Sequence, residues 1–131
     1  DAAGKVTVKG PGVAKITVKA AATTDYKAAS KTVTVTVAPK KQSISLVNKI
    51  KKQLTIKWKK NTKASGYQVV YSTNKKFTGK KTVRKAKTTT SYKIKGLKKG
   101  KKYYVKVRSY KTVNGKRIYG AYSTAKKATI K

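Results

Sequence analysis

Apolar and polar residues alternate with a period of two along much of this 131-residue chain. Residues 31–37 have the sequence Lys-Thr-Val-Thr-Val-Thr-Val, and residues 54–58 have the sequence Leu-Thr-Ile-Lys-Trp. Such alternation is typical of half-buried β-strands, because their side chains point to opposite faces in turn. No segment shows the period of an amphipathic helix. The pattern therefore predicts an all-β chain.

The first 38 residues contain three alternating segments, at 4–8, 13–20 and 31–37. Gly10-Pro11-Gly12 is expected to form a turn between the first two, because glycine permits a positive φ and proline fixes its own. The small and polar residues 21–30 are expected to form a hairpin connection or a mobile loop, with Asp25 as an ordinary loop residue. Because proline cannot donate to a central strand ladder, Pro39 predicts a domain boundary with a linker at 39–42.

Further strands are predicted between residues 43 and 131, at 43–48, 53–59, 67–73, 81–84, 91–95, 102–113 and 116–130, the last with a break near Gly120. Seven short strands in a segment of this length predict a β-sandwich. Asn114-Gly115 lies between two alternating runs and is the preferred sequence of a type I′ hairpin turn. The strand ending at Val113 is therefore expected to pair antiparallel with the strand that follows.

The second segment, residues 43–131, resembles a fibronectin type III domain. The residues that carry the resemblance are Trp58 at the end of the second strand, Tyr67 near the start of the third, and the motif Leu97-x-x-Gly100-x-x-Tyr103. The resemblance implies a seven-stranded sandwich in which Tyr103 is the corner tyrosine, hydrogen-bonded back to the preceding loop, with Leu97 packed beneath it.

Residues 1–38 resemble the C-terminal part of a bacterial immunoglobulin-like domain of group 2. The similar stretches are Gly4–Val8, Pro11–Val18 and Val33–Val37. The expected fold is thus two immunoglobulin-like β-sandwich segments, of which the first is incomplete. The Lys-rich stretch from Tyr71 to Phe77 and Asn114-Gly115-Lys116 resemble repeats on surface proteins of Gram-positive gut bacteria of the Lachnospiraceae or Clostridia kind.

Composition excludes most catalysis. The chain has 36 Lys and Arg residues against two acids, Asp1 and Asp25, and its net charge is +34; it has no His, Cys or Glu. No catalytic dyad, triad, thiolate or clustered metal-ligand set is expected, so we predict a non-enzymatic chain without cofactor or metal. No apolar run reaches the roughly 18 residues of a membrane span, and neither Met nor a signal region precedes Asp1, which indicates a mature chain or a fragment. A bacterial extracellular or cell-surface location fits the lack of Cys.

One face of the strand at 102–113 is the first candidate site. If Tyr103 and the valines after it point inward, the opposite face carries Tyr104, Lys106, Arg108 and Tyr110, and the neighbouring strand adds Gln68, Val70 and Ser72. Cations and rings interleaved in this way suit the binding of bases, sugars, phosphates or carboxylates. The alternative is that the tyrosines are cross-strand packing pairs covered by Lys stems.

Lysine clusters at turns are the second candidate, chiefly Lys98, Lys99, Lys101 and Lys102 around Gly100. Arginine is scarce, and direct base recognition depends on its bidentate geometry, so polyanion binding is expected to be nonspecific. The expected partners are teichoic acids, acidic glycans, host glycosaminoglycans, DNA or RNA.

Three functions follow from these observations. The first is a surface module, a spacer or adhesive unit that holds anionic polymers through its charge. The second is a structural subunit of an extracellular fibre or tube, which self-associates by strand complementation at the open first segment. The third is nonspecific nucleic-acid binding in a biofilm matrix through the face around Arg108.

Overall fold

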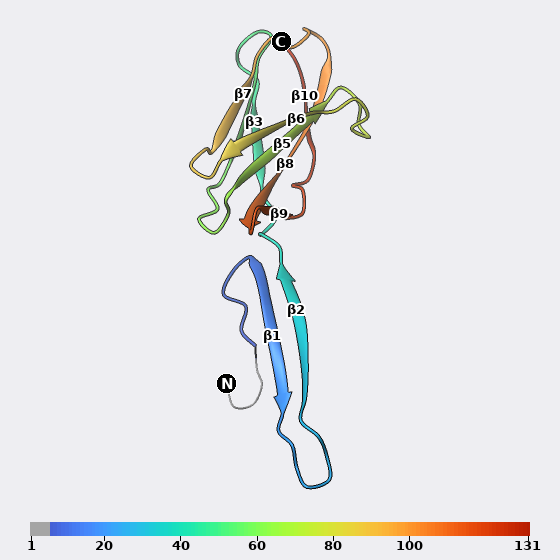
Figure 1. Ribbon diagram of the computed structural model, residues 1–131. Helices are drawn as coiled ribbons and strands as arrows, with labels where there is room; N and C mark the ends of the chain where they lie inside the picture. The colour runs from blue at the N-terminus through green and yellow to red at the C-terminus, as the bar shows by residue number, and fades with distance from the viewer. Residues whose placement is uncertain (1–5) are drawn as a thin grey trace.

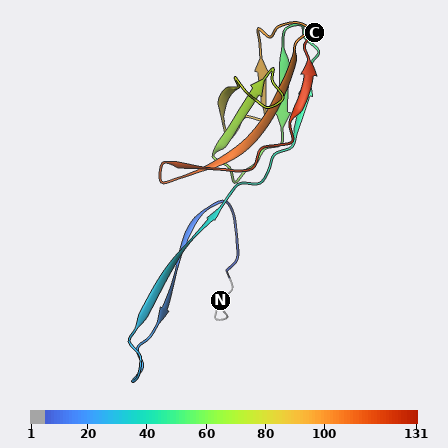
Figure 2. The same cartoon turned by 90° about the vertical axis from the view of Figure 1, so that its right-hand side faces the viewer.

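The computed structural model describes residues 6–131 and contains strands and turns but no helix in that range. Two strands near the N-terminus, β1 (Gly12–Ala20) and β2 (Ala29–Val37), form a long hairpin. The remaining strands form a β-sandwich at one end of this hairpin (Figure 1). The side view shows the hairpin extending away from the sandwich (Figure 2). The all-β prediction is confirmed.

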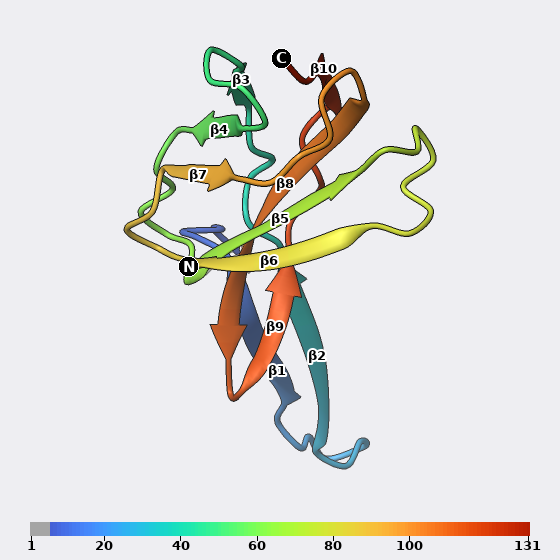
Figure 3. The same ribbon diagram turned by 90° about the horizontal axis from the view of Figure 1, so that it is seen from above.

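The smaller sheet of the sandwich has three strands, β3 (Ile44–Val47), β4 (Leu54–Trp58) and β7 (Ser91–Ile94), with β4 in the centre. The larger sheet has the order β10-β8-β5-β6, and its strands are β5 (Gly66–Ser72), β6 (Lys81–Ala86), β8 (Lys102–Val113) and β10 (Lys126–Thr129). A further strand, β9 (Lys116–Tyr119), pairs with the end of β8. Figure 3 shows β5 and β6 running side by side, with β3, β4 and β7 in a separate group. All strands predicted after residue 43 are confirmed, and the break near Gly120 divides the last one into β9 and β10.

The core lies between the two sheets and is formed by the inward positions of the alternating segments. Trp58 of β4 packs against Tyr67 of β5, with ring centroids 5.4 Å apart. The other buried core residues are Ile44, Leu54, Ile56, Val69, Ile94, Leu97, Val105, Val107 and Ile130. Removing this apolar surface from water provides the main driving force for folding. Period-two alternation therefore places one face of each central strand in the core, as predicted.

The turn before β8 has the expected corner geometry. Leu97 is buried, and Gly100 has a φ of 75°, a conformation that favours glycine. The backbone N–H of Lys98 donates to the hydroxyl of Tyr103 over 3.4 Å. Asn114 and Gly115 have φ values of 47° and 74° between β8 and β9. Two successive positive φ angles define the predicted type I′ turn.

The N-terminal segment differs in part from its prediction. The strands predicted at 13–20 and 31–37 are confirmed as β1 and β2, and residues 21–28 connect them. The predicted strand at 4–8 is wrong over residues 6–8, which are not in a strand, while Gly4 and Lys5 lie outside the described residues. Alternation alone does not provide a partner strand, and bends at Gly10 and Pro11 separate this segment from β1.

The β1–β2 hairpin has two chemically different faces. Ile16 lies opposite Val33 and Thr17 opposite Thr32, and directly opposed residues share a face. One face is polar, and there the hydroxyls of Thr17 and Thr32 lie 2.8 Å apart. The other face carries the apolar residues Ala14, Ile16, Val18, Val33, Val35 and Val37, together with Lys31, the register partner of Val18. Within residues 6–131 no strand pairs with the free edges of this hairpin, and Val18 remains 64% exposed.

Candidate anion-binding surfaces

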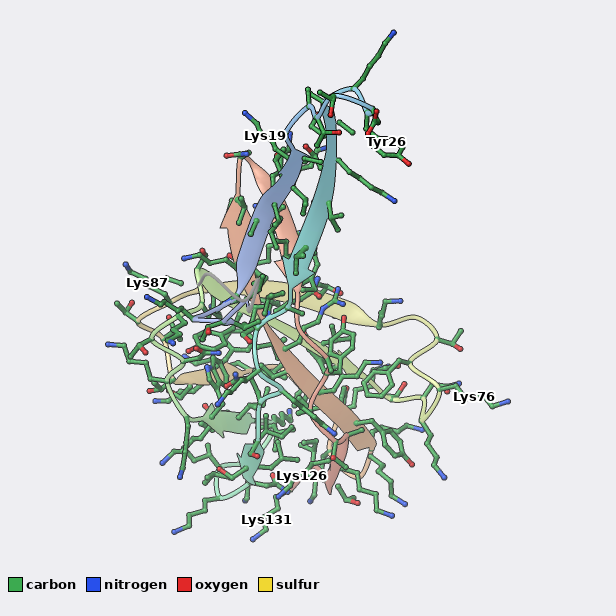
Figure 4. All side chains as sticks on the ribbon, turned by 90° about the horizontal axis from the view of Figure 1, so that it is seen from below. Lys19, Tyr26, Lys76, Lys87, Lys126 and Lys131 are labelled. Atoms are coloured by element: carbon green, nitrogen blue, oxygen red, sulfur yellow. The ribbon has the colours of Figure 1, made fainter. Side chains whose placement is uncertain are left out.

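Cationic side chains are distributed over the whole described surface. None of the Lys and Arg residues between 6 and 131 is buried, and Asp25 is the single acidic side chain in that range. Figure 4 shows Lys19, Lys76, Lys87, Lys126 and Lys131 pointing outward from both the hairpin and the sandwich. Most of these charges therefore have no internal counterion, and they repel one another.

The outer face of β8 carries the residues predicted there. Val105 and Val107 are fully buried and point into the core, so Tyr104, Lys106 and Arg108 point to the other side of the sheet. These three side chains are half-buried, as is Tyr110.

Arg108 is the centre of a polar and aromatic cluster on this face. Its Nε donates to Gln68 Oε1 over 2.7 Å, and the hydroxyl of Tyr122 donates to the same oxygen over 3.0 Å. Its guanidinium carbon lies 3.8 Å from the ring centroid of Tyr119 and 4.3 Å from that of Tyr122. Contacts of this kind are cation–π interactions, and partial burial strengthens them. The guanidinium is thus held by the chain itself.

Lys106 extends the same cluster toward the other end of the strand. Its Nζ lies 4.1 Å from the ring centroid of Phe77 and 4.4 Å from that of Tyr122. Val70 lies on β5, which pairs with β8 on one side and with β6 on the other. Its side chain is fully buried, although it is not part of the core between the two sheets. Gln68, Val70 and Ser72 were expected to add to an open surface, and they are buried instead.

The four predicted residues of β8 are not all together. Tyr110 joins the cluster through Tyr119, at 5.7 Å between ring centroids, and Arg117 lies 5.5 Å from its ring. Tyr104 lies toward the other end of the strand, with Ser72 and Lys127 as its register partners. Sequence reasoning missed Phe77, Tyr119 and Tyr122. Phe77 and Tyr122 lie in loops, where alternation gives no direction, and aromatic character was their only signal. Tyr119 could have been found, because the predicted two-residue turn at Asn114-Gly115 places it opposite Tyr110.

The lysines near Gly100 lie in a different place, at the turn between β7 and β8. Lys98, Lys101 and Lys102 line a shallow hollow of about 530 Å³ together with Thr73 and Tyr103, and Lys99 is exposed in the same turn. Lys98, Lys101 and Lys102 remain exposed at its rim.

A third basic region lies where the hairpin meets the sandwich. A hollow of about 590 Å³ is bounded there by parts of three segments, residues 8–11, 37–43 and 59–63. Its lysines come from the pairs Lys40-Lys41 and Lys59-Lys60, which the sequence shows as charge clusters, and from Lys9 and Lys63.

Residues 6–131 contain no group of three or more His, Cys, Asp or Glu side chains arranged to hold a metal ion. No helix in this range is long and apolar enough to cross a membrane.

Solved structures similar to this chain show the same fold. The chicken CNTN1 FN1-FN3 domains are 21% identical, with a TM-score of 0.58, over 77% of this chain and 35% of that one. The fn3 domain of human contactin 1 is 16% identical, with a TM-score of 0.62, over 72% of this chain and 81% of that one. This chain thus spans about a third of the length of the chicken structure.

A third similar structure is the sixth fibronectin type III domain of human fibronectin type III domain containing protein 3, 16% identical with a TM-score of 0.59, over 73% of this chain and 89% of that one. No curated protein sequence matches the chain. The sequence model of the fibronectin type III domain matches residues 37–125, more than half of the chain. On that match, and on the sandwich that these residues form, the chain belongs to the fibronectin type III family.

Proposed function

We propose that this chain is a non-enzymatic module of a bacterial cell surface, a spacer or adhesive unit that holds anionic polymers through its charge. Fibronectin type III domains are typically non-enzymatic and commonly extracellular modules. The observation that carries the proposal is that every described Lys and Arg side chain is exposed or half-buried, while Asp25 is the single acidic side chain in residues 6–131. Such a surface attracts polyanions by releasing their counterions.

The origin of the chain is part of the same proposal. The Lys-rich fibronectin type III segment and the stretch similar to a group 2 immunoglobulin-like domain fit a surface protein of a Gram-positive gut bacterium. Teichoic acids, acidic glycans and host glycosaminoglycans are the polyanions found in that setting, and they are the partners we propose.

Binding to isolated bacterial cell walls tests this function. Walls with their anionic polymers intact are expected to retain the chain, and walls stripped of those polymers are expected to retain far less. The logarithm of the binding constant should fall linearly with the logarithm of salt concentration. Equal retention on both kinds of wall, or strong retention at about 1 M salt, would overturn the proposal, because electrostatic attachment must weaken when charges are screened within roughly 3 Å.

A second candidate is a structural subunit that polymerises through the β1–β2 hairpin. The observation in its favour is the exposed apolar face of that hairpin, where Val33 is 47% and Val18 64% exposed, together with the two free edges. An isolated two-stranded hairpin is marginally stable in water, and a third strand or a packed face stabilises it. A second copy that adds such a strand would make a contact that propagates.

Light scattering and electron microscopy in about 0.5 M salt, where repulsion between subunits is screened, test this candidate. Val18→Lys places a charge on the apolar face, and Thr17→Lys places the same charge on the polar face as the matched control. Polymers that form in wild type and in Thr17→Lys but not in Val18→Lys support it. A monomer in wild type contradicts it.

A further inference from the structure

The hollow between the hairpin and the sandwich, which we name the junction pocket, has a volume of about 590 Å³. Ligand sites in proteins commonly have volumes of about 300–1,000 Å³. It is lined by residues 8–11, 37–38, 40–43 and 59–63. Its walls therefore come from the hairpin, the segment joining it to the sandwich, and the β4–β5 loop.

The wall formed by the β4–β5 loop is fixed to the sandwich. The backbone N–H of Asn61 donates to the hydroxyl of the fully buried Tyr67 over 2.6 Å. Asn61 Oδ1 accepts from the backbone N–H of Lys63 over 3.1 Å, and the N–H of Ala64 donates to the carbonyl of Asn61 over 3.1 Å. These bonds hold the part of the loop that directly follows Lys59 and Lys60.

The wall formed by the joining segment is fixed in the same way. The buried Ser109 donates its hydroxyl to the carbonyl of Lys40 over 3.1 Å, and the buried Gln42 donates to that carbonyl over 3.1 Å. Gly120 packs so closely against the carbonyl of Pro39 that a Cβ atom would overlap it. The backbone of Lys40 and Lys41 is thus held on the sandwich while their side chains stay exposed.

The third wall belongs to the segment before β1. Lys63 Nζ donates to the backbone carbonyl of Lys9, and a Cβ atom on Gly10 would lie 3.4 Å from Lys63 Cδ. This side chain links the β4–β5 loop to the segment before β1. A ligand in the pocket would contact both the hairpin and the sandwich, and would limit their relative motion.

The lining concentrates positive charge. Six of the fifteen lining residues are lysines and none is acidic: Lys9, Lys40, Lys41, Lys59, Lys60 and Lys63. Asp25, the only acid in residues 6–131, lies in the loop beyond the far end of β1. The hydroxyls of Ser43 and Thr62 add neutral hydrogen-bond donors to the same lining.

We propose that the junction pocket binds a short run of phosphate groups. This inference rests on the proposed function, because it assigns to one site a part of the general attraction for polyanions. Lysine is a compact point charge without the planar fork of arginine, and it binds phosphate well. An oligophosphate carries at least one negative charge on each of several adjacent phosphate groups, whereas the carboxylates of a sugar-acid polymer are separated by a whole sugar ring. Neighbouring ammonium groups in a small volume therefore favour phosphate.

Isothermal titration at about 0.3 M salt, which screens charges more than roughly 6 Å apart, tests the site. The probes are inorganic tripolyphosphate, poly(glycerol phosphate) and, as a carboxylate polymer, polygalacturonate. The pocket variant combines Lys40→Gln, Lys41→Gln, Lys59→Gln and Lys60→Gln. The matched control combines Lys75→Gln, Lys76→Gln, Lys80→Gln and Lys81→Gln, which remove the same charge from exposed positions that do not line the pocket.

We expect wild type to bind the phosphate probes with one saturable site per chain. The pocket variant should lose about tenfold or more in affinity, and the control about threefold or less, because the control loses only long-range attraction. Unchanged fluorescence of the buried Trp58 shows that each variant is folded. Binding of tripolyphosphate identifies free oligophosphate as a sufficient ligand, and binding of the polymer alone identifies a phosphodiester chain. Either result supports the site.

Equal losses in the pocket variant and the control would overturn the junction pocket and leave the proposed function intact. Equal sensitivity of polygalacturonate binding to the pocket substitutions would overturn the preference for phosphate. A wild-type chain that binds none of the three probes even at low salt would overturn the site and the proposed function together.

Discussion

The side chain of Tyr110 in β8 covers Gly66, its register partner in β5. A Cβ atom at residue 66 would lie 2.5 Å from the hydroxyl oxygen of Tyr110 and 2.7 Å from the carbonyl oxygen of Lys85. Only glycine leaves room for this ring. The same ring lies beside Tyr119 and Arg117, so Gly66 sits at one end of the aromatic and cationic cluster on the outer face.

Gly66→Ala is therefore expected to destabilise the fold. The added methyl group must displace the Tyr110 ring and also meets a backbone oxygen, and overpacking of this kind costs about 1–3 kcal/mol. Urea unfolding followed by Trp58 fluorescence measures the change. Gly12→Ala is the control, because no atom lies within 4 Å of a Cβ there and its φ is not positive. Equal stability of the Gly66→Ala variant and wild type would contradict the close packing.

Arg108→Ala is expected to cost more free energy of unfolding than free energy of polyanion binding. The guanidinium stacks on Tyr119 and Tyr122 and donates to the buried Gln68, so its removal costs about 1–3 kcal/mol from lost cation–π and charge-assisted hydrogen bonds. Arg84→Ala removes the same charge from an exposed position in β6. Urea unfolding and binding to poly(glycerol phosphate), measured for both variants, separate the effect of the lost Arg108 contacts from the effect of losing one positive charge. A stability loss as small as that of Arg84→Ala would contradict the internal role.

The sequence predicted the sandwich well because its strands alternate strictly and its turns have diagnostic residues. Leu54 to Trp58 can bury an apolar face in only one register, and Asn114-Gly115 favours one turn type. The sequence correctly predicted which side chains of β8 point away from the core. It did not predict that Phe77 and Tyr122 cover part of this outer face, because both lie in loops, where no periodic pattern shows which way a side chain points.

The junction pocket could not be predicted from the sequence. Lys40 and Lys59 are separated by a whole β-hairpin of sequence, and each is visible only as part of a local charge cluster. Their proximity depends on how Pro39 packs against Gly120 and how Asn61 is held by Tyr67. These are tertiary contacts between positions with no shared pattern.

The pH dependence of stability tests how Tyr71 packs beside Tyr92 and Tyr103. Burial raises the pKa of its phenol above the usual 10.0, and the nearby Tyr92 and Tyr103 raise it further. The native state thus holds this proton more tightly than the unfolded chain does, so stability from Tyr71 is full below pH 10 and falls as the pH rises through the native pKa. Wild type is therefore expected to lose unfolding free energy relative to Tyr71→Phe over that range. A difference that stays constant with pH would contradict the shift.

Salt is expected to stabilise this protein, in contrast to proteins held by surface ion pairs. At a net charge of +34 the exposed cations repel one another, and Asp25 alone cannot offset them within residues 6–131. Raising sodium chloride from about 0.05 to 0.5 M shortens the screening distance from roughly 14 to 4 Å. Because each relieved surface repulsion contributes up to about 1 kcal/mol and many are relieved at once, the unfolding free energy should rise by at least about 1 kcal/mol. Urea unfolding at each salt concentration measures it.

The control for this prediction is a variant with fewer charges in one turn. Lys98→Gln, Lys99→Gln, Lys101→Gln and Lys102→Gln together remove like charges that are close in sequence, so the variant should be more stable than wild type at low salt and should gain less from added salt. A general effect of salt on apolar burial would instead stabilise both proteins equally. Parallel salt dependences would therefore assign the stabilisation to the core between the two sheets and not to the charge on the surface.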